Sequence, residues 1–421
     1  MTQPDLVQRL FASPSVADAP MIREVILSRL MRRYAADRSE VGYGACSRLL
    51  ASAMTARNQT VLETFISGLD QGLEGQAMEK PPADLETILS ELWSQNANQL
   101  SSIRAASRLG FAPACDRAMA LAIDPLAPTE TRLAMLALLG EIGRPGSAEA
   151  LMTLVAGNDR EPITKAALKA LARFTDDTIA DRVLQIYPAM SSSVRSTARD
   201  LMFARRSWAL AFVRSVDEGK FASSEVTADQ LRRLGLHDDP QLRAMVRKCW
   251  GTFQSESSGE KLADVRRLNN DLRATRGNPV AGKTLFTQLC ATCHRLFGEG
   301  NAVGPDLTQA NRKDTDFLLV NVVDPSATIR KEYLSYIAET KDGRLLNGLI
   351  AEQTSASITL LSANGERTTL ARDQLVRLDE SQVSLMPEEL VTKLKPDELR
   401  NLFSYLQSEG PINESQSRNE K

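Results

Sequence analysis

The feature that most constrains this chain is the string Cys-Ala-Thr-Cys-His at residues 290–294. Two thiols separated by two residues, with an imidazole directly after the second, can face the same side of one helical turn. Such a turn can form thioether bonds to both vinyl groups of one haem while the imidazole reaches the iron. Cys290, Cys293 and His294 therefore predict one covalently attached c-type haem, with His294 as an axial ligand of the iron.

Other chemistries also use closely spaced cysteines. A structural zinc site needs four ligands, and a redox-active pair would follow a strand in a βαβ unit. The segment before the motif has helical periodicity instead, and a chance occurrence of so short a string is the remaining alternative. The isolated cysteines are typical of small buried apolar residues. Outside the motif the chain has four further Cys and His residues, none of which forms a second close pair: Cys46, Cys115, Cys249 and His237.

A metal-bound histidine needs a hydrogen-bond acceptor on its second ring nitrogen, which fixes the orientation of the ring. In class I cytochromes c the carbonyl of a proline shortly after the histidine takes this role. The string Gly304-Pro305-Asp306-Leu307 stands at the corresponding place. Pro305 is therefore the predicted acceptor, and a simple turn is the alternative.

The iron needs a sixth ligand, unless that site is open. Methionine is a usual axial partner in cytochromes c, and Met386 is the only methionine downstream of the motif. It stands in a Ser-Leu-Met-Pro string just before the last predicted helix, so we expect Met386 to ligate the iron. A methionine that merely packs in the core is the structural alternative. His237 is the other candidate ligand, although it lies upstream in a predicted loop.

Residues 1–255 have the periodicity of helices throughout, because apolar residues recur three and four positions apart. The segments that begin at Thr131, Thr164 and Val194 resemble one another, and a second helical segment follows each of them. Repeated helix pairs predict an α-solenoid of the HEAT type, in which each pair buries its apolar face against its neighbours. An irregular helical bundle is the alternative.

The rest of the chain is predicted to form a second domain. Residues 256–276 are polar and favour a connector, residues 277–412 the domain itself, and residues 413–421 a polar tail. One helix leads into the motif, and another begins at Pro396, a residue that suits a first helical turn. Gly282 on the first of these helices is expected to let the last helix approach closely.

A stretch rich in β-forming residues interrupts this domain at residues 333–380. The pairs Asp342-Gly343 and Asn364-Gly365 lie between apolar runs and are a strong signal of β-hairpins. The stretch therefore predicts a small β-barrel or meander inserted into a helical domain.

Residues 280–408 resemble the Planctomycetes- and Verrucomicrobia-type haem-binding domain, a variant of class I cytochrome c. In large proteins with this domain a HEAT-like region precedes it, and a β-propeller resembling quinoprotein sugar or alcohol dehydrogenases lies further upstream. This chain has no propeller segment. The matching strings are Gly-Lys-Thr-Leu-Phe at 282–286, the Cys-Ala-Thr-Cys-His motif with the six residues that follow it, Val303-Gly-Pro-Asp-Leu, Asp324-Pro-Ser, Lys341-Asp-Gly-Arg and Ser384-Leu-Met-Pro-Glu.

The predicted fold is mainly α: a HEAT-like solenoid followed by a cytochrome c-like helical domain with its β insert. The predicted function is electron transfer to or from a redox partner protein, such as a dehydrogenase, and a non-catalytic role is favoured. Three alternatives stay open. The chain is the C-terminal part of a split or truncated propeller-type sugar or alcohol dehydrogenase, a haem-based sensor with an open sixth site, or a structural repeat protein.

Composition adds few constraints. A net charge of −2, with 43% apolar and 25% charged residues, is typical of globular proteins and gives no reason to expect nucleic acid as a partner. No apolar run is long enough to span a bilayer. Covalent haem implies a periplasmic or otherwise exported protein. The first twenty residues lack the basic start and apolar core of a secretory signal, and the sequence leaves open whether the chain is a fragment of a larger protein.

Overall fold

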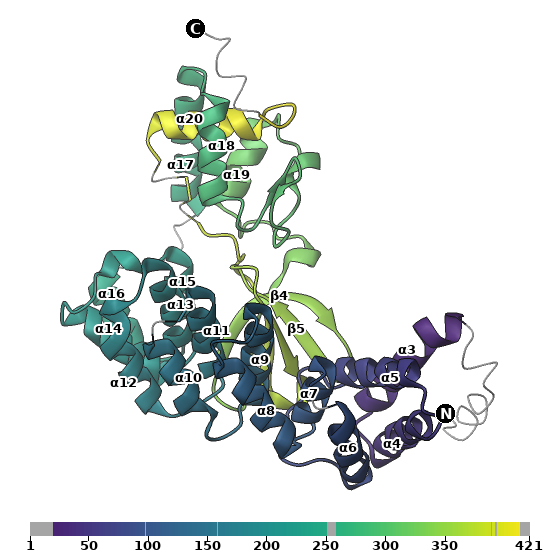
Figure 1. Cartoon of the computed structure of the whole chain (residues 1–421). Coiled ribbons are helices and arrows are strands. Elements are labelled where there is room, and N and C mark those ends of the chain that lie inside the picture. Colours follow the sequence, from purple (N-terminus) through teal and green to yellow (C-terminus); the bar gives the residue numbers. More distant parts are fainter. Residues whose placement is uncertain are drawn as a thin grey trace. The chain divides into compact units, whose positions relative to one another are not determined.

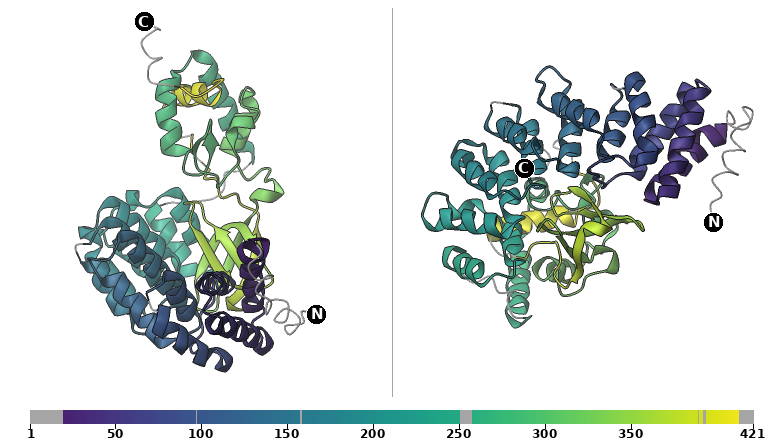
Figure 2. Two further views of the ribbon diagram at one scale, coloured as in Figure 1. Left: turned by 45° about the vertical axis from the view of Figure 1, so that its right-hand side comes forward. Right: turned by 90° about the horizontal axis from the view of Figure 1, so that it is seen from below.

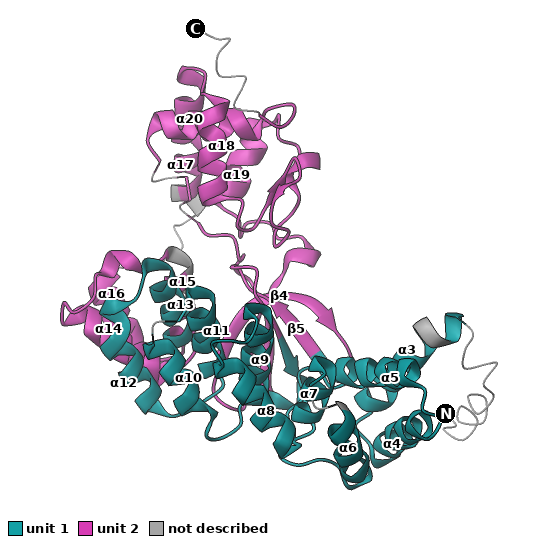
Figure 3. Ribbon diagram, in the orientation of Figure 1, with its two compact units in different colours: residues 1–202, 355–357, 369–374 teal, residues 203–354, 358–368, 375–421 magenta. Residues whose placement is uncertain are grey.

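The computed structural model describes residues 20–96, 98–157, 159–250, 258–388, 390–391 and 394–412. The polar tail expected over residues 413–421 lies outside this part. The described chain is mostly helical, as its periodicity predicts, and it divides into two compact units (Figure 3). Among the described residues, no helix is both long and apolar enough to cross a bilayer.

Unit 1 comprises Met1–Met202 with two short stretches of the later chain, Ser355–Ser357 and Thr369–Gln374. Arg38 accounts for this grouping, because its guanidinium donates to the carbonyl oxygen of Ala356 (2.8 Å) and pairs with Asp373 (3.2 Å). The helices that begin in unit 1 are α3 (Leu27–Ala36), α4 (Glu40–Thr55), α5 (Gln59–Gly72), α6 (Ala83–Asn96), α7 (Leu100–Arg108), α8 (Ala112–Ile123), α9 (Thr129–Ile142), α10 (Ser147–Ala156), α11 (Glu161–Leu171), α12 (Asp177–Ile186) and α13 (Ser192–Phe203).

The three similar segments recognised in the sequence fall on α9, α11 and α13, and α10 and α12 follow the first two. Within unit 1 the helices pack in succession: α3 against α5, α5 against α7, α7 against α9, and α9 against α11 (Figures 1 and 2). The helices between them also contact one another, α4 with α6 and α8 with α10. Each helix therefore packs mainly on its near neighbours in the sequence.

One buried arginine links three of these helices. Arg108 at the end of α7 pairs with Asp70 of α5 and with Glu141 of α9, at 2.8 Å for the second pair. A buried charge is tolerated only when it is paired, so the guanidinium requires both neighbouring helices to be in place.

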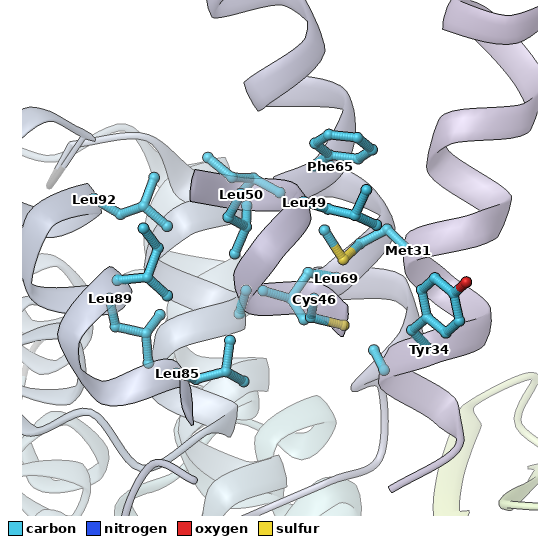
Figure 4. Packing of buried hydrophobic residues seen from close by; sticks show 14 of the residues in the cluster. Met31, Tyr34, Cys46, Leu49, Leu50, Phe65, Leu69, Leu85, Leu89 and Leu92 are labelled. Atoms are coloured by element: carbon cyan, nitrogen blue, oxygen red, sulfur yellow. The ribbon is translucent and has the colours of Figure 1, made fainter. Parts of the chain in front are cut away.

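Figure 4 shows the apolar core of the first helices of unit 1. Cys46 is fully buried there among Met31, Leu49 and Leu69, and burial raises the pKa of its thiol to about 12. Cys115 is also buried, whereas Cys249 is half-buried. The first two thus occupy the position of small apolar residues, as their helical surroundings predict.

Unit 2 comprises Phe203–Thr354, Ile358–Thr368 and Leu375–Lys421. Its helices are α14 (Arg206–Asp217), α15 (Ala228–Gly235), α16 (Pro240–Trp250), α17 (Ser258–Ala274), α18 (Pro279–Leu289), α19 (Thr315–Val323) and α20 (Pro396–Leu406). Shorter helical turns of the chain are η1 (Ile22–Ile26), η2 (Tyr187–Ala189), η3 (Ser223–Glu225), η4 (Leu307–Gln309), η5 (Lys331–Tyr333) and η6 (Arg372–Gln374).

The segment predicted to be a connector contains the helix α17, which packs into an apolar core of unit 2. Leu268 of α17 is 1% exposed and lies in the same apolar core as Phe286 of α18 and Phe403 of α20. Val265 and Leu272 pack against that core from the same face of α17. Apart from the buried Lys261, the charged side chains that the structure describes in this segment are exposed or half-buried, and its high charge is why its composition suggested a connector.

The inserted strands form an antiparallel five-stranded sheet with the order β6-β5-β4-β3-β7. Consecutive strands β3 to β6 are neighbours, as in the predicted meander, and β7 returns to pair with β3. The sheet is open, with β6 and β7 at its edges, so the barrel alternative is not what forms. The strands are β3 (Ser335–Thr340), β4 (Leu345–Gln353), β5 (Ser357–Leu361), β6 (Arg367–Ala371) and β7 (Leu375–Ser381), and a separate pair is β1 (Arg295–Leu296) with β2 (Glu299–Gly300).

The two compact units do not divide at residue 255, where the sequence suggested a boundary, because α14 to α16 group with the second unit. The turn between β3 and β4 explains this. Leu345 donates its backbone N–H to the carbonyl oxygen of Ala204 (3.0 Å), and Arg205 donates to the carbonyl oxygen of Asp342. The hairpin is therefore fixed to the chain between α13 and α14.

α18 and α20 cross in close contact at Gly282. A Cβ atom at this position would collide with the carbonyl oxygen of Asn401 and lie 2.8 Å from the Cβ of Tyr405. The rings of Phe286 and Tyr405 pack beside the crossing, 5.5 Å apart between centroids. Only glycine allows two helices to approach this closely at that point.

We expect Gly282→Ala to lower the free energy of unfolding by about 3 kcal/mol, because the methyl group overpacks a backbone contact that cannot yield. Denaturant unfolding of the full chain, followed by circular dichroism, measures the change. Gly410→Ala is the control, since nothing lies within 4 Å of the added Cβ. Equal effects of the two substitutions would show that the helix crossing does not depend on this glycine.

Candidate haem site

The motif begins where α18 ends. Asn278 caps the start of this helix by accepting hydrogen bonds from the backbone N–H of Val280 (2.8 Å) and Ala281 (3.2 Å). At the other end, the backbone N–H groups of Cys293 and His294 both donate to the carbonyl oxygen of Cys290, at 3.1 and 2.8 Å. The five motif residues therefore close into one tight turn that continues the helix.

A second segment runs back along this turn and holds it. Val303 and Gly304 both donate their backbone N–H to the carbonyl oxygen of Cys293, at 3.0 and 2.7 Å. The return is made by β1 and β2, which pair Arg295 with Gly300. Gly300 has φ +97°, a conformation that L side chains rarely adopt, and a Cβ there would collide with the carbonyl of His294.

The imidazole of His294 is oriented by this second segment. Its Nδ1 lies 2.9 Å from the carbonyl oxygen of Pro305, so Nδ1 carries the proton and donates. Burial lowers the pKa of the ring, which favours the neutral form. Among the described residues this is the only hydrogen bond of the ring, and its Nε2 is left available. A neutral imidazole held at Nδ1 by a backbone carbonyl is the form that binds a metal through Nε2.

Gly304 lies directly against this ring. A Cβ at position 304 would come within 2.6 Å of His294 Cε1 and 2.9 Å of Nδ1. The glycine is thus needed for the ring to lie where it meets the carbonyl of Pro305.

The two thiols are not those of a redox-active pair. Burial raises the pKa of the Cys290 thiol to about 12, with a smaller contribution from Cys293. A reactive dithiol instead needs a lowered thiol pKa. Zinc is not supported either, because among the described residues no three His, Cys, Asp or Glu side chains gather as a metal site would require. Two neighbouring thiols beside an apolar core and an oriented neutral imidazole fit a covalently bound haem.

The turn between β5 and β6 also reaches the motif. The thiol of Cys293 lies 3.3 Å from the carbonyl oxygen of Ala363, which accepts its hydrogen bond, and a Cβ on Gly365 would be 3.9 Å from Val303. Gly365 has φ +80°, as the predicted hairpin turn requires. The sequence indicated the turn through Asn364-Gly365, but no local signal showed what it would contact.

Met386 lies in a non-helical segment between β7 and α20. Its backbone N–H donates to the hydroxyl of Ser384 (3.1 Å), and the N–H of Ser384 donates to the hydroxyl of Ser326 (3.2 Å). Two of the strings noted in the sequence, Asp324-Pro-Ser and Ser384-Leu-Met-Pro-Glu, are therefore in contact. Met386 is half-buried, and its coordination of the iron stays a prediction.

His237, the other histidine, has a structural environment of its own. It is 7% exposed, and its Nε2 lies 2.8 Å from the carbonyl oxygen of Phe203. Burial lowers the pKa of this ring. The hydrogen bond links the turn before α16 to the end of α13 and accounts for a histidine at this position.

The motif, the oriented histidine and the flanking helices can be compared with known families. Residues 279–356 match the model of the cytochrome c family. The match begins with α18, includes the motif and Pro305, and extends past β4. The chain therefore contains a C-terminal cytochrome c-like domain, which supports covalent haem and a role in electron transfer. No curated protein sequence matches the chain.

We expect Gly304→Ala to push the His294 ring away from Pro305 and to weaken its bond to a haem iron. In an acid titration of the haem-loaded protein, followed by its visible spectrum, the variant should lose the histidine ligand at a higher pH than the unmodified chain. Ala302→Ser, at an exposed position two residues earlier, is the control. If the two variants titrate together, the ring does not require the glycine.

Proposed function

We propose that this protein carries one haem c, attached through Cys290 and Cys293, and exchanges electrons with a redox partner protein. His294 would be the proximal ligand and the carbonyl of Pro305 would orient it. The observation that carries the proposal is the state of the His294 ring, with Nδ1 held by Pro305 and Nε2 left available. The haem would supply one-electron exchange at its iron. The residues of the chain attach it, orient the ligand and surround it with an apolar core.

Met386 is the proposed sixth ligand. It stands in a segment tied at Ser384 to Ser326, so the methionine is on a restrained stretch of backbone. A thioether ligand raises the potential of a haem. With both axial positions occupied by the protein there is no open site for a substrate, which favours an electron carrier over an enzyme.

The helices before this domain would serve as a scaffold. We propose that they form a HEAT-type solenoid, supported by the contacts of each helix in unit 1 with its near neighbours in the sequence. Stacked helix pairs provide an extended surface for a partner, such as a dehydrogenase. The proposed covalent haem favours an exported protein, since c-type haem is attached after export. The Planctomycetes-type strings and the proposed solenoid are in keeping with this. The C-terminal part of a propeller-type dehydrogenase is the alternative, and a propeller reading frame directly upstream would favour it.

Covalent attachment is tested by exported expression with a cytochrome c maturation system. The denatured protein should keep a pyridine-haem spectrum after extraction with acidic acetone, and the double variant Cys290→Ala, Cys293→Ala should lose it. Cys249→Ala, which removes a half-buried thiol outside the motif, should retain it. Haem that extracts freely from the unmodified protein would refute the proposal.

The sixth ligand is tested by Met386→Ala. A thioether on low-spin ferric haem gives a weak absorption band near the red end of the visible spectrum, and the substitution should remove this band. It should also lower the reduction potential, because the thioether that raises it is lost, and let cyanide bind at the sixth position that is left open. Met245→Ala, at a half-buried methionine of α16, is the control and should change none of these. A high-spin spectrum in the unmodified protein would instead indicate an open site and favour a haem sensor.

A further inference from the structure

We infer that Lys261 is a positioning residue for Met386: from α17, it fixes the segment that presents the methionine to the haem. This inference rests on the proposed function, because it assumes that Met386 is the sixth ligand. Lys261 lies outside residues 279–356, which match the cytochrome c family, and precedes the haem-binding motif.

The contacts of Lys261 are those of a buried ion cluster. The residue is 6% exposed, and its Nζ lies 2.7 Å from Oδ1 of Asp324 and 3.2 Å from Oε1 of Glu388. Glu388 is two residues after Met386. A buried ammonium is costly unless it is paired, so the fold keeps both carboxylates beside it.

The two carboxylates differ in how firmly they are held. Asp324 ends α19, where its backbone N–H donates to the carbonyl oxygen of Val320 (2.9 Å). Glu388 belongs to the non-helical segment between β7 and α20. Lys261 therefore links Glu388 to Asp324 at the end of α19. Because Glu388 is two residues from Met386, this link also restrains the segment that contains the methionine.

The same segment is fixed a second time on the other side of Met386. The backbone N–H of Ser384 donates to the hydroxyl of Ser326, two residues after Asp324. Met386 is thus held between two anchors, Ser384 and Glu388, and both attach to the short stretch 324–326. The contact between Glu388 and Asp324 depends on Lys261, because two carboxylates repel each other unless a cation lies between them.

The ammonium group of Lys261 stays charged near neutral pH. Burial alone would lower the pKa of Lys261, but hydrogen bonds and charge from Asp324 and Glu388 outweigh it and raise the pKa above its usual value. The ammonium is therefore present under the conditions in which a cytochrome works. Without it, the two carboxylates would repel each other and the Glu388 side would move, since Asp324 is held by α19.

The test uses Lys261→Met in the full-length, haem-loaded protein, because methionine keeps the length of the apolar stem and removes the charge. We expect a weaker red band in the ferric protein and an apparent cyanide affinity about tenfold higher, as the state with Met386 detached becomes more populated. The amount of covalently bound haem should not change. Lys261→Arg, which can pair with both carboxylates, should restore most of the band.

Two control variants separate positioning from general destabilisation. Leu242→Ala removes a fully buried side chain from α16, outside both the ion cluster and the core that contains Leu268 and Phe286, so it should lower the unfolding midpoint and leave the band and the cyanide affinity unchanged. Lys283→Met removes a half-buried lysine of α18 that pairs with Glu299 of β2, and it should change neither. The spectra and the cyanide affinities are measured at a temperature well below the unfolding midpoint of every variant.

Glu388→Gln covers the case in which Lys261→Met does not fold, since it keeps the side-chain length and leaves the pair of Lys261 with Asp324 intact. It should raise the cyanide affinity in the same direction. Unchanged band and cyanide affinity in both variants, in a protein where Met386→Ala does lose the band, would overturn the role of Lys261 and leave the proposed function standing. If Met386→Ala itself has no effect, the assignment of the sixth ligand fails instead.

Discussion

The haem region of this protein depends on one backbone contact, the crossing of α18 and α20 at Gly282. α18 leads directly into the motif, and α20 follows the segment of Met386, so this crossing fixes both ends of the chain that contains the candidate ligands. The rings of Phe286 and Tyr405 fill the space beside the contact. The chain between the two helices, which contains β1, β2, α19 and the inserted sheet, therefore begins and ends at this crossing.

Much of this arrangement could be predicted because it is encoded locally. His294 and Pro305 are eleven residues apart, and the return of the chain between them is a short hairpin. Apolar spacing identified α18 and α20, and Gly343 and Gly365, each with φ +80°, mark the turns that Asp342-Gly343 and Asn364-Gly365 indicated. Such signals need no knowledge of distant residues.

The features that escaped prediction are all long-range. The charges of α17 suggested a connector, whereas Leu268 packs into a core formed by helices later in the chain. β7 pairs with β3 rather than with β6, and Ala363 reaches Cys293 across seventy residues of sequence. Periodicity shows which face of an element is apolar, but not which other element covers it. The same limit applies to Lys261, whose two partners lie 63 and 127 residues away.

The pairing of β3 with β7 has a further consequence for how such a molecule can change. Ser335, the first residue of the sheet, lies opposite Ser381, the last one, so the insert leaves and re-enters the haem domain at the same place. The two ends of the sheet therefore lie as close together as the ends of a tight loop, whatever the length of the chain between them. Since the entropy of closing a loop depends mainly on where its ends lie and only weakly on its length, a longer or shorter sheet would change little in the cost of closing this segment. The contacts made by its turns, with Cys293 at Ala363 and with Ala204 at Leu345, are what would be lost if the sheet were reduced to a short turn.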